Sequence, residues 1–141
     1  MSKFRWAVAV AALAPMLAST PASAGGSGPH PVTPWVRGVE AHTPTWVDIH
    51  WQTGAKICDA HVWVKGEHVD VRYPSNTGTY TSFHRDEMLK PGEVGRTAVA
   101  VTAHRDKSAF VPLEATLIYT NCKSDKAKVK GFRLTLPVIV S

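Results

Sequence analysis

The segment ICDAHVWV, residues 57–64, brings together residue types that can carry out chemistry. Cys58, Asp59 and His61 offer the ligands of a zinc or copper site, and a cysteine near a histidine is also a nucleophile with its base. Both kinds of site need the side chains to converge on one centre. The chemistry therefore depends on the secondary structure that carries these residues.

Apolar residues at alternate positions predict that residues 57–65 form a β-strand. Neighbouring side chains of a strand point to opposite faces of the sheet, so Cys58 would face the core while Asp59 and His61 face solvent. That geometry keeps the thiol out of hydrogen-bonding reach of the imidazole. The sequence thus predicts a structural cysteine and no catalytic couple.

Residues 68–73 repeat the alternation, and Gly66-Glu67 would join them to the preceding strand as a hairpin with a type II′ turn. The predicted register pairs Lys65 with His68, Val64 with Val69, Trp63 with Asp70, Val62 with Val71, and His61 with Arg72. One face of this hairpin would be apolar. The other would be polar and carry a single indole.

The same alternation fixes the inward faces of other strands. The expected inward residues are Val47, Ile49 and Trp51 in the strand 45–52, and Phe132, Leu134 and Leu136 in the last strand. In 113–121, strict alternation would turn Cys122 outward. A bulge or the end of the strand must therefore lie between Tyr119 and Cys122 if the cysteine reaches the core.

The first 24 residues have the three-part layout of a secretory signal peptide. Lys3 and Arg5 form a positive end, residues 6–17 are apolar, and small residues at 22–24 permit cleavage after Ala24. An apolar run of about 12 residues is too short for a bilayer, which takes about 20. We expect an exported protein, extracellular or associated with the cell wall, with no stable membrane insertion after cleavage.

Cleavage after Ala24 would leave 117 residues, enough for one domain. We expect a flexible leader at 25–31 and one β domain at 32–141. The formal net charge falls from +5 to +3 because two basic residues leave with the signal peptide. That modest charge and the missing recognition motifs argue against a nucleic-acid partner. The lysine-rich run 123–130 is interpreted as a solvated loop beside a strand edge.

Two cysteines in an exported chain predict one disulfide, Cys58 to Cys122. It would close a loop of about 65 residues, which the chain-entropy model values at about 4 kcal/mol. Expected strands lie at 33–39, 45–52, 57–65, 68–73, 79–84, 96–103, 113–121 and 131–140. This all-β pattern of seven to eight short antiparallel strands predicts an immunoglobulin-like two-sheet sandwich.

The turn Leu89-Lys90-Pro91-Gly92-Glu93, followed by the alternating strand 97–103, resembles bacterial secreted immunoglobulin-like modules of the CARDB or NEW3 type. The resemblance covers residues 43–121 and implies a binding, spacer or adhesion role. Leu89 would fill the core, and Gly92 would take the positive φ that such a turn requires. Trp63 follows Cys58 too closely for the tryptophan and cysteine spacing of antibody domains.

Seven histidines raise the alternative of a secreted metal-binding protein. The outward candidates are His50, His61 and His68, with Asp48, Asp59 and Asp70 near them in sequence. Strands 45–52 and 57–65 commonly lie in different sheets of a sandwich, which would separate the first two histidines. A protease inhibitor or a small-ligand carrier is a further alternative. We expect no cofactor and no enzyme, since the serines lack a nucleophile motif.

The favoured function is a non-catalytic interaction protein that binds an extracellular protein or a cell-wall glycan. Its predicted binding residues face outward: Trp46, His61, Trp63, Asp70 and Arg72. Exposed indoles can stack on sugars or anchor a protein partner. The alternative is that Trp63 is covered by a loop or packs on the Arg72 stem.

Overall fold

The computed structural model describes residues 28–84 and 86–141, and this part of the chain contains eight strands and no helix. The strands are β2 (His30–Pro31), β3 (Val39–Glu40), β4 (Thr45–Gln52), β5 (Cys58–Lys65), β6 (Val69–Arg72), β7 (Gly95–Ala103), β8 (Ala109–Thr120) and β9 (Lys128–Ile139). The prediction of an all-β protein is confirmed.

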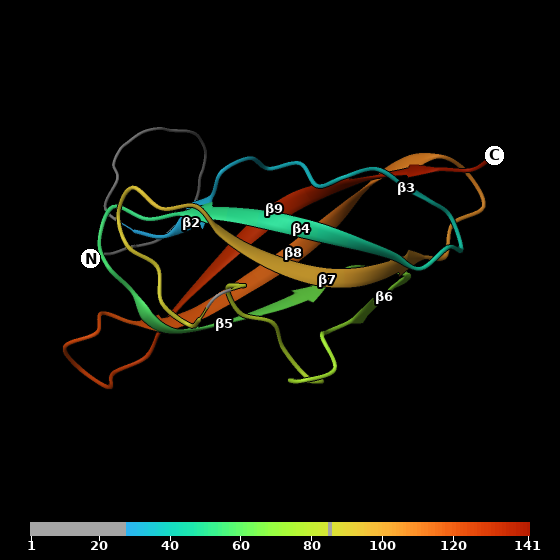
Figure 1. Ribbon diagram of the computed structural model, residues 1–141. Helices are drawn as coiled ribbons and strands as arrows, with labels where there is room; N and C mark the ends of the chain where they lie inside the picture. Colours follow the sequence, from blue (N-terminus) through green and yellow to red (C-terminus); the bar gives the residue numbers. More distant parts are fainter. Residues whose placement is uncertain (1–27, 85) are drawn as a thin grey trace, which may run out of the picture.

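The strands form two four-stranded hydrogen-bonded sheets, in the orders β2-β4-β7-β6 and β3-β9-β8-β5. In Figure 1, β4 and β7 cross in front of β8 and β9. All neighbours are antiparallel except β3 and β9, which run parallel. Strands β4 and β5 lie in different sheets, as expected. We call the two sheets the β4–β7 sheet and the β8–β9 sheet.

The inward residues expected from the alternation form the core. Val47, Ile49 and Trp51 are at most 3% exposed, and the Trp51 indole N–H donates to the Thr97 hydroxyl at 3.0 Å. In β5, buried Ala60, Val62 and Val64 alternate with more exposed residues. Leu89 is also buried, and Gly92 has a φ of 86°, so both expectations for that turn are confirmed.

The predicted hairpin between β5 and β6 is wrong. Strand β5 pairs with β8, and β6 pairs with β7, so the five pairs expected from Lys65–His68 to His61–Arg72 do not form. The link 66–68 carries the chain from one sheet to the other. Gly66 lacks a positive φ and is required for space, because a Cβ there would lie 2.6 Å from Leu113 Cδ2.

Two further expected strands differ from the structure. Residues 33–39 make one isolated bridge, Trp35 to Thr135, before β3 begins. Residues 79–84 also form one isolated bridge, between Thr81 and Val62. Strand β2, in contrast, includes His30 and Pro31, which the sequence assigned to the flexible leader; they pair with Gln52 and Trp51.

Cys58 and Cys122 form the predicted disulfide, with Cα atoms 5.0 Å apart. Strand β8 ends at Thr120, and Cys122 lies beyond it with a φ of 71°, so the end of the strand lets the sulfur turn inward. A register shift occurs in β5 instead, between Cys58 and His61. The disulfide joins neighbouring strands of one sheet, unlike the inter-sheet bridge of antibody domains.

Candidate functional site

The structure divides the five predicted binding residues between two surfaces. His61 and Trp63 lie on the outer face of β5, in the β8–β9 sheet, whereas Trp46, Asp70 and Arg72 lie on the outer face of the β4–β7 sheet. The alternation was therefore read in the right frame. The prediction that all five residues share one surface was wrong, because it depended on the pairing of β5 with β6 in a hairpin.

On β5, the aromatic residues pack against one another. The His61 and Tyr80 rings lie 4.1 Å apart between centroids, and Trp63 lies 5.9 Å from Tyr80 and 6.1 Å from His61. His61 Nε2 is 3.0 Å from Glu87 Oε2. Through these contacts, Tyr80 and Glu87 hold residues 73–84 and 86–89 against β5.

The same segment covers the free edge of β5 by backbone contacts. Ile57 exchanges hydrogen bonds with Leu89, and Val62 exchanges them with Thr81. The Tyr73 hydroxyl accepts from the Val64 N–H at 3.0 Å and donates to its carbonyl at 3.2 Å. An edge satisfied in this way cannot template another strand. Trp63 is thus half-buried in a structural cluster, which favours the alternative in which a loop covers it.

On the other sheet, small residues in β7 lie between larger ones in the neighbouring strands. Ala100 pairs with Trp46 on one side and with Arg72 on the other. Adjacent strands are roughly 5 Å apart, so these two residues rise from backbones separated by roughly 10 Å. Trp46 is 53% exposed. We call the outer surface over Ala98 and Ala100, between the positions of Trp46 and Arg72, the furrow.

An ion pair and a histidine–carboxylate hydrogen bond lie beside the furrow. Arg96 of β7 lies 3.5 Å from Asp48 of β4, and His104 lies 2.8 Å from Asp70 of β6. At the Ala98 end, the furrow opens into a cleft of about 310 Å³, lined among others by Asn76, Thr77, Ser82, His84 and Arg96. The surface therefore combines an exposed indole with hydrogen-bonding groups of both signs.

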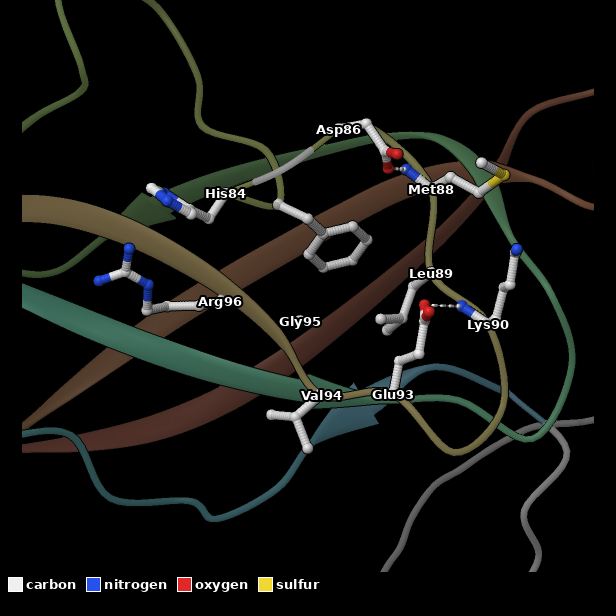
Figure 2. A pocket seen from close by; sticks show the side chains of 10 residues that line it. His84, Asp86, Met88, Leu89, Lys90, Glu93, Val94, Gly95 and Arg96 are labelled. Atoms are coloured by element: carbon white, nitrogen blue, oxygen red, sulfur yellow. Dashed lines mark hydrogen bonds between the residues drawn. The ribbon is translucent and has the colours of Figure 1, made fainter.

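A larger cleft of about 560 Å³ lies under the loop that leads into β7 (Figure 2). It shares Phe83, His84 and Arg96 with the smaller cleft. Two of its wall residues, Phe83 and Leu89, are at most 6% exposed. Its carboxylates shape the loop: Asp86 accepts from the Met88 N–H at 2.7 Å, and Glu93 accepts from the Lys90 N–H at 3.1 Å.

Sequence reasoning missed Ala98, Ala100, Tyr80 and Arg96. The small outward residues of 97–103 were visible in the sequence, but the strands on either side of them were not. Tyr80 was assigned to a strand instead of a loop that folds back on β5. These positions depend on contacts distant in sequence, for which the local pattern carries no signal.

Among residues 28–84 and 86–141, no group of three or more His, Cys, Asp or Glu side chains is arranged to hold a metal ion. His50 lies on β4, His61 on β5, and His68 in the link between sheets with a φ of 58°. A search of the same residues for a helix long and apolar enough to span a membrane finds none.

No protein-family model matches the chain, and no curated protein matches it. Among solved structures it is similar to the yeast GGA1 GAE domain, at 14% identity and a TM-score of 0.48 over 77% of this chain and 98% of that one. It is also similar to the ASH/PapD-like domain 7 of human CEP192, at 8% identity and a TM-score of 0.44 over 86% and 93%. AvmM, which catalyses macrocyclization in alchivemycin A biosynthesis, matches at 10% identity and a TM-score of 0.32 over 75% and 86%. Likenesses this distant carry no argument about the function of this chain.

Proposed function

We propose that this protein is a non-catalytic binding module that holds a glycan in the furrow. The observation that carries the proposal is the exposed Trp46 indole on the same outer face as Arg72, with the small Ala100 between them. An indole face offers apolar contact to a sugar ring, while the guanidinium, Asp48 and the 310 Å³ cleft offer hydrogen bonds to its hydroxyls.

The small side chain at Ala100 allows this arrangement. A larger residue there would fill the space between Trp46 and Arg72 and prevent a ring from lying against the indole. The continuation of the furrow toward Asn76 and Thr77 suits an extended chain of sugars better than a single unit. A cell-wall polysaccharide is the ligand class that fits an exported module of this kind.

The test is titration of soluble cell-wall polysaccharide fragments into the full-length protein, followed by calorimetry. Trp46→Ala should weaken binding about tenfold or more, since buried aromatic anchors commonly contribute upwards of 1–2 kcal/mol to an interface. Trp35→Ala is the matched control, because Trp35 has a similar exposure, 50%, and contacts the other sheet. Equal affinities of the wild type and the Trp46 variant would refute the furrow as the site.

An extracellular protein is the second candidate partner. Trp35 and Phe110 form an exposed edge-to-face pair, with ring centroids 5.5 Å apart and exposures of 50% and 71%. Exposed aromatic pairs of this kind are enriched at protein interfaces. Capture of a surface protein that is lost with Phe110→Ser and kept with Trp46→Ala would support this partner over the glycan.

The finer description of the fold is also a proposal. We infer an immunoglobulin-like two-sheet sandwich, related to CARDB- or NEW3-type modules. Its support is the strand order, in which β2-β4-β7-β6 corresponds to strands A, B, E and D, and β9-β8-β5 to G, F and C. Buried residues from both sheets belong to one hydrophobic cluster, which supports face-to-face packing.

Export is proposed on the signal-like residues 1–24, which lie outside the described residues together with the cleavage position Ala24. The disulfide supports it, because such bonds persist in oxidising compartments. Mass spectrometry of protein from the culture medium should give a mature chain that begins at Gly25. A chain found only inside cells and beginning at Met1 would contradict export.

A further inference from the structure

The 560 Å³ cleft beside β7 opens to solvent and is lined by both apolar and charged side chains. Figure 2 shows Met88 and Val94 on opposite sides, with Leu89 and Gly95 between them. Phe83 and Leu89 pack over Gly95 so closely that a Cβ there would lie 2.8 Å from Phe83 Cδ1 and 3.1 Å from Leu89 Cδ1. Val94 is 57% exposed at the mouth. This volume is within the common range for small-molecule sites, and the exposed parts of Met88 and Val94 offer contact to an alkyl group.

The polar and charged side chains around the cleft differ in how many hydrogen bonds and ion pairs they already form. Both carboxylates, Asp86 and Glu93, accept backbone hydrogen bonds within the loop. Within the described residues, no hydrogen bond or ion pair involves the side chain of His84 or Lys90. Arg96 shares one guanidinium nitrogen with Asp48, at 3.5 Å, which leaves its other donors available. His84, Lys90 and Arg96 therefore keep donors available around the cleft, and each carboxylate keeps its second oxygen as an acceptor.

His84 and Arg96 form the boundary between the two clefts, since both residues line each of them. Their backbones are joined by a hydrogen bond from the His84 N–H to the Arg96 carbonyl at 2.9 Å, and Figure 2 shows their side chains extending to the same side. A guanidinium and an imidazole placed together suit an oxyanion.

We propose that the 560 Å³ cleft binds a single-chain amphiphile with an oxyanion head group. The apolar chain lies against Met88 and Val94, and the head group lies between His84 and Arg96. This site adjoins the smaller cleft at the end of the furrow and shares Phe83, His84 and Arg96 with it. Its ligand differs in chemistry from a polysaccharide, so the binding of each can be measured separately. It gives a physical basis to a role as a small-ligand carrier.

The test is calorimetric titration of the full-length protein with decyl phosphate below its micelle concentration. Decanoate, decanol and inorganic phosphate are the parallel ligands. Decyl phosphate should bind saturably at one site, decanol more weakly, and inorganic phosphate not measurably, because the apolar side chains and the Arg96 guanidinium act together. The comparison of decanoate with decyl phosphate distinguishes a carboxylate from a phosphate head group.

Two variants separate the contributions of the head group and the chain. Arg96→Gln should weaken the binding of decyl phosphate about tenfold, since it removes one charge-assisted hydrogen bond. The affinity for decanol should be unchanged. Val94→Asn should weaken the binding of both ligands about two- to fivefold, because apolar contact with the chain is lost. Both side chains are exposed enough for the fold to persist, which circular dichroism would verify.

Lys107→Gln, in the loop at the opposite end of β7, is the charge-matched control and should bind like the wild type. Loss confined to the Arg96 and Val94 variants, in the pattern above, supports the site. Absence of saturable binding by decyl phosphate, or equal weakening by Arg96→Gln and Lys107→Gln, would overturn it. Neither outcome depends on whether the furrow binds a polysaccharide.

Discussion

Trp63 and Trp46 occupy equivalent positions in the sequence pattern but different environments in the fold. Each is an outward residue in a strand whose alternate positions are buried. Trp63 packs with Tyr80 and His61 and is half-buried, whereas Trp46 is 53% exposed beside Ala100. Alternation therefore identifies which indoles face outward. What packs over them decides whether they can bind a partner.

The regions around these residues differ in the same way. Strand β5 is covered along its edge by residues 73–84 and 86–89 and is linked at Cys58 by the disulfide. The furrow of the β4–β7 sheet has small residues at its centre, with an ion pair and a histidine–carboxylate hydrogen bond beside it. We infer that contacts around β5 mainly stabilise the protein and that the furrow mainly binds. The following predictions test this division, beginning with the largest effect.

Loss of the disulfide should cost the most stability. The double variant Cys58→Ala/Cys122→Ala should lower the free energy of unfolding by about 2–5 kcal/mol, because the unfolded chain regains the entropy of an open loop of about 65 residues. Urea denaturation followed by circular dichroism measures the change. Polysaccharide binding by the remaining folded protein should be unchanged, because the disulfide joins strands of the other sheet. Weaker binding at full folding would show that the two regions are coupled.

The two tryptophans should give opposite results. Trp63→Ala should lower the free energy of unfolding by about 2 kcal/mol, through lost burial and two lost ring contacts, with little effect on binding. Trp46→Ala should change stability by less than about 0.5 kcal/mol while weakening polysaccharide binding. Urea midpoints and calorimetry on both variants test the pair. The division between the regions is wrong if Trp63→Ala abolishes binding without a loss of stability.

Much of the fold could be predicted from local pattern. The strands 45–52 and 57–65, the inward faces of Trp51 and Leu134, and the disulfide all depend on alternation or on cysteine count, which the sequence displays directly. The pairing of β5 with β8 could not be read in this way. Strands β6 and β8 offer similar alternating patterns, and a link as short as 66–68 suggested a hairpin.

The candidate site was predicted only in part, for the same reason. Trp46 and Arg72 were identified as outward residues, but their placement across Ala100 requires three strands distant in sequence to align. The clefts were not predicted, because loop 83–94 reaches its position through contacts of Leu89 with Ile57 and of His84 with Arg96. The direction of a side chain thus follows from the local sequence, whereas the assembly of the site depends on how distant strands and loops are arranged.

The cover on the edge of β5 should have a smaller, separable effect. Tyr73→Phe removes the hydroxyl that pairs with both backbone groups of Val64 and should cost about 1 kcal/mol. It also leaves an uncovered strand edge, so we expect faster self-association in sedimentation experiments. Tyr80→Phe keeps the ring contact with His61 and is the control. Equal association rates of the two variants would show that Tyr73 does not protect the edge.

The smallest effect concerns a partly buried charge in the β8–β9 sheet. Burial, followed by the neighbouring charge of Lys128, lowers the pKa of Lys130 below its usual 10.5. Between the lowered value and 10.5, the unfolded state binds more protons than the folded state, so this residue's contribution to stability rises with pH. Lys130→Gln lacks that contribution. The stability of the wild type relative to the variant should therefore increase as the pH approaches 10.5.

Urea denaturation of both proteins at a series of alkaline pH values measures this difference. Tyr119 titrates in the same range with the opposite sign, because burial raises its pKa above 10.0 and stability then falls as the unfolded phenol ionises. It is present in both proteins, so it cancels in the comparison. Lys128→Gln should reduce the slope only partly, since its charge is the second cause of the shift. Parallel pH curves for the wild type and Lys130→Gln would mean that the Lys130 ammonium is fully solvated, and that burial in the β8–β9 sheet does not extend to this end of β9.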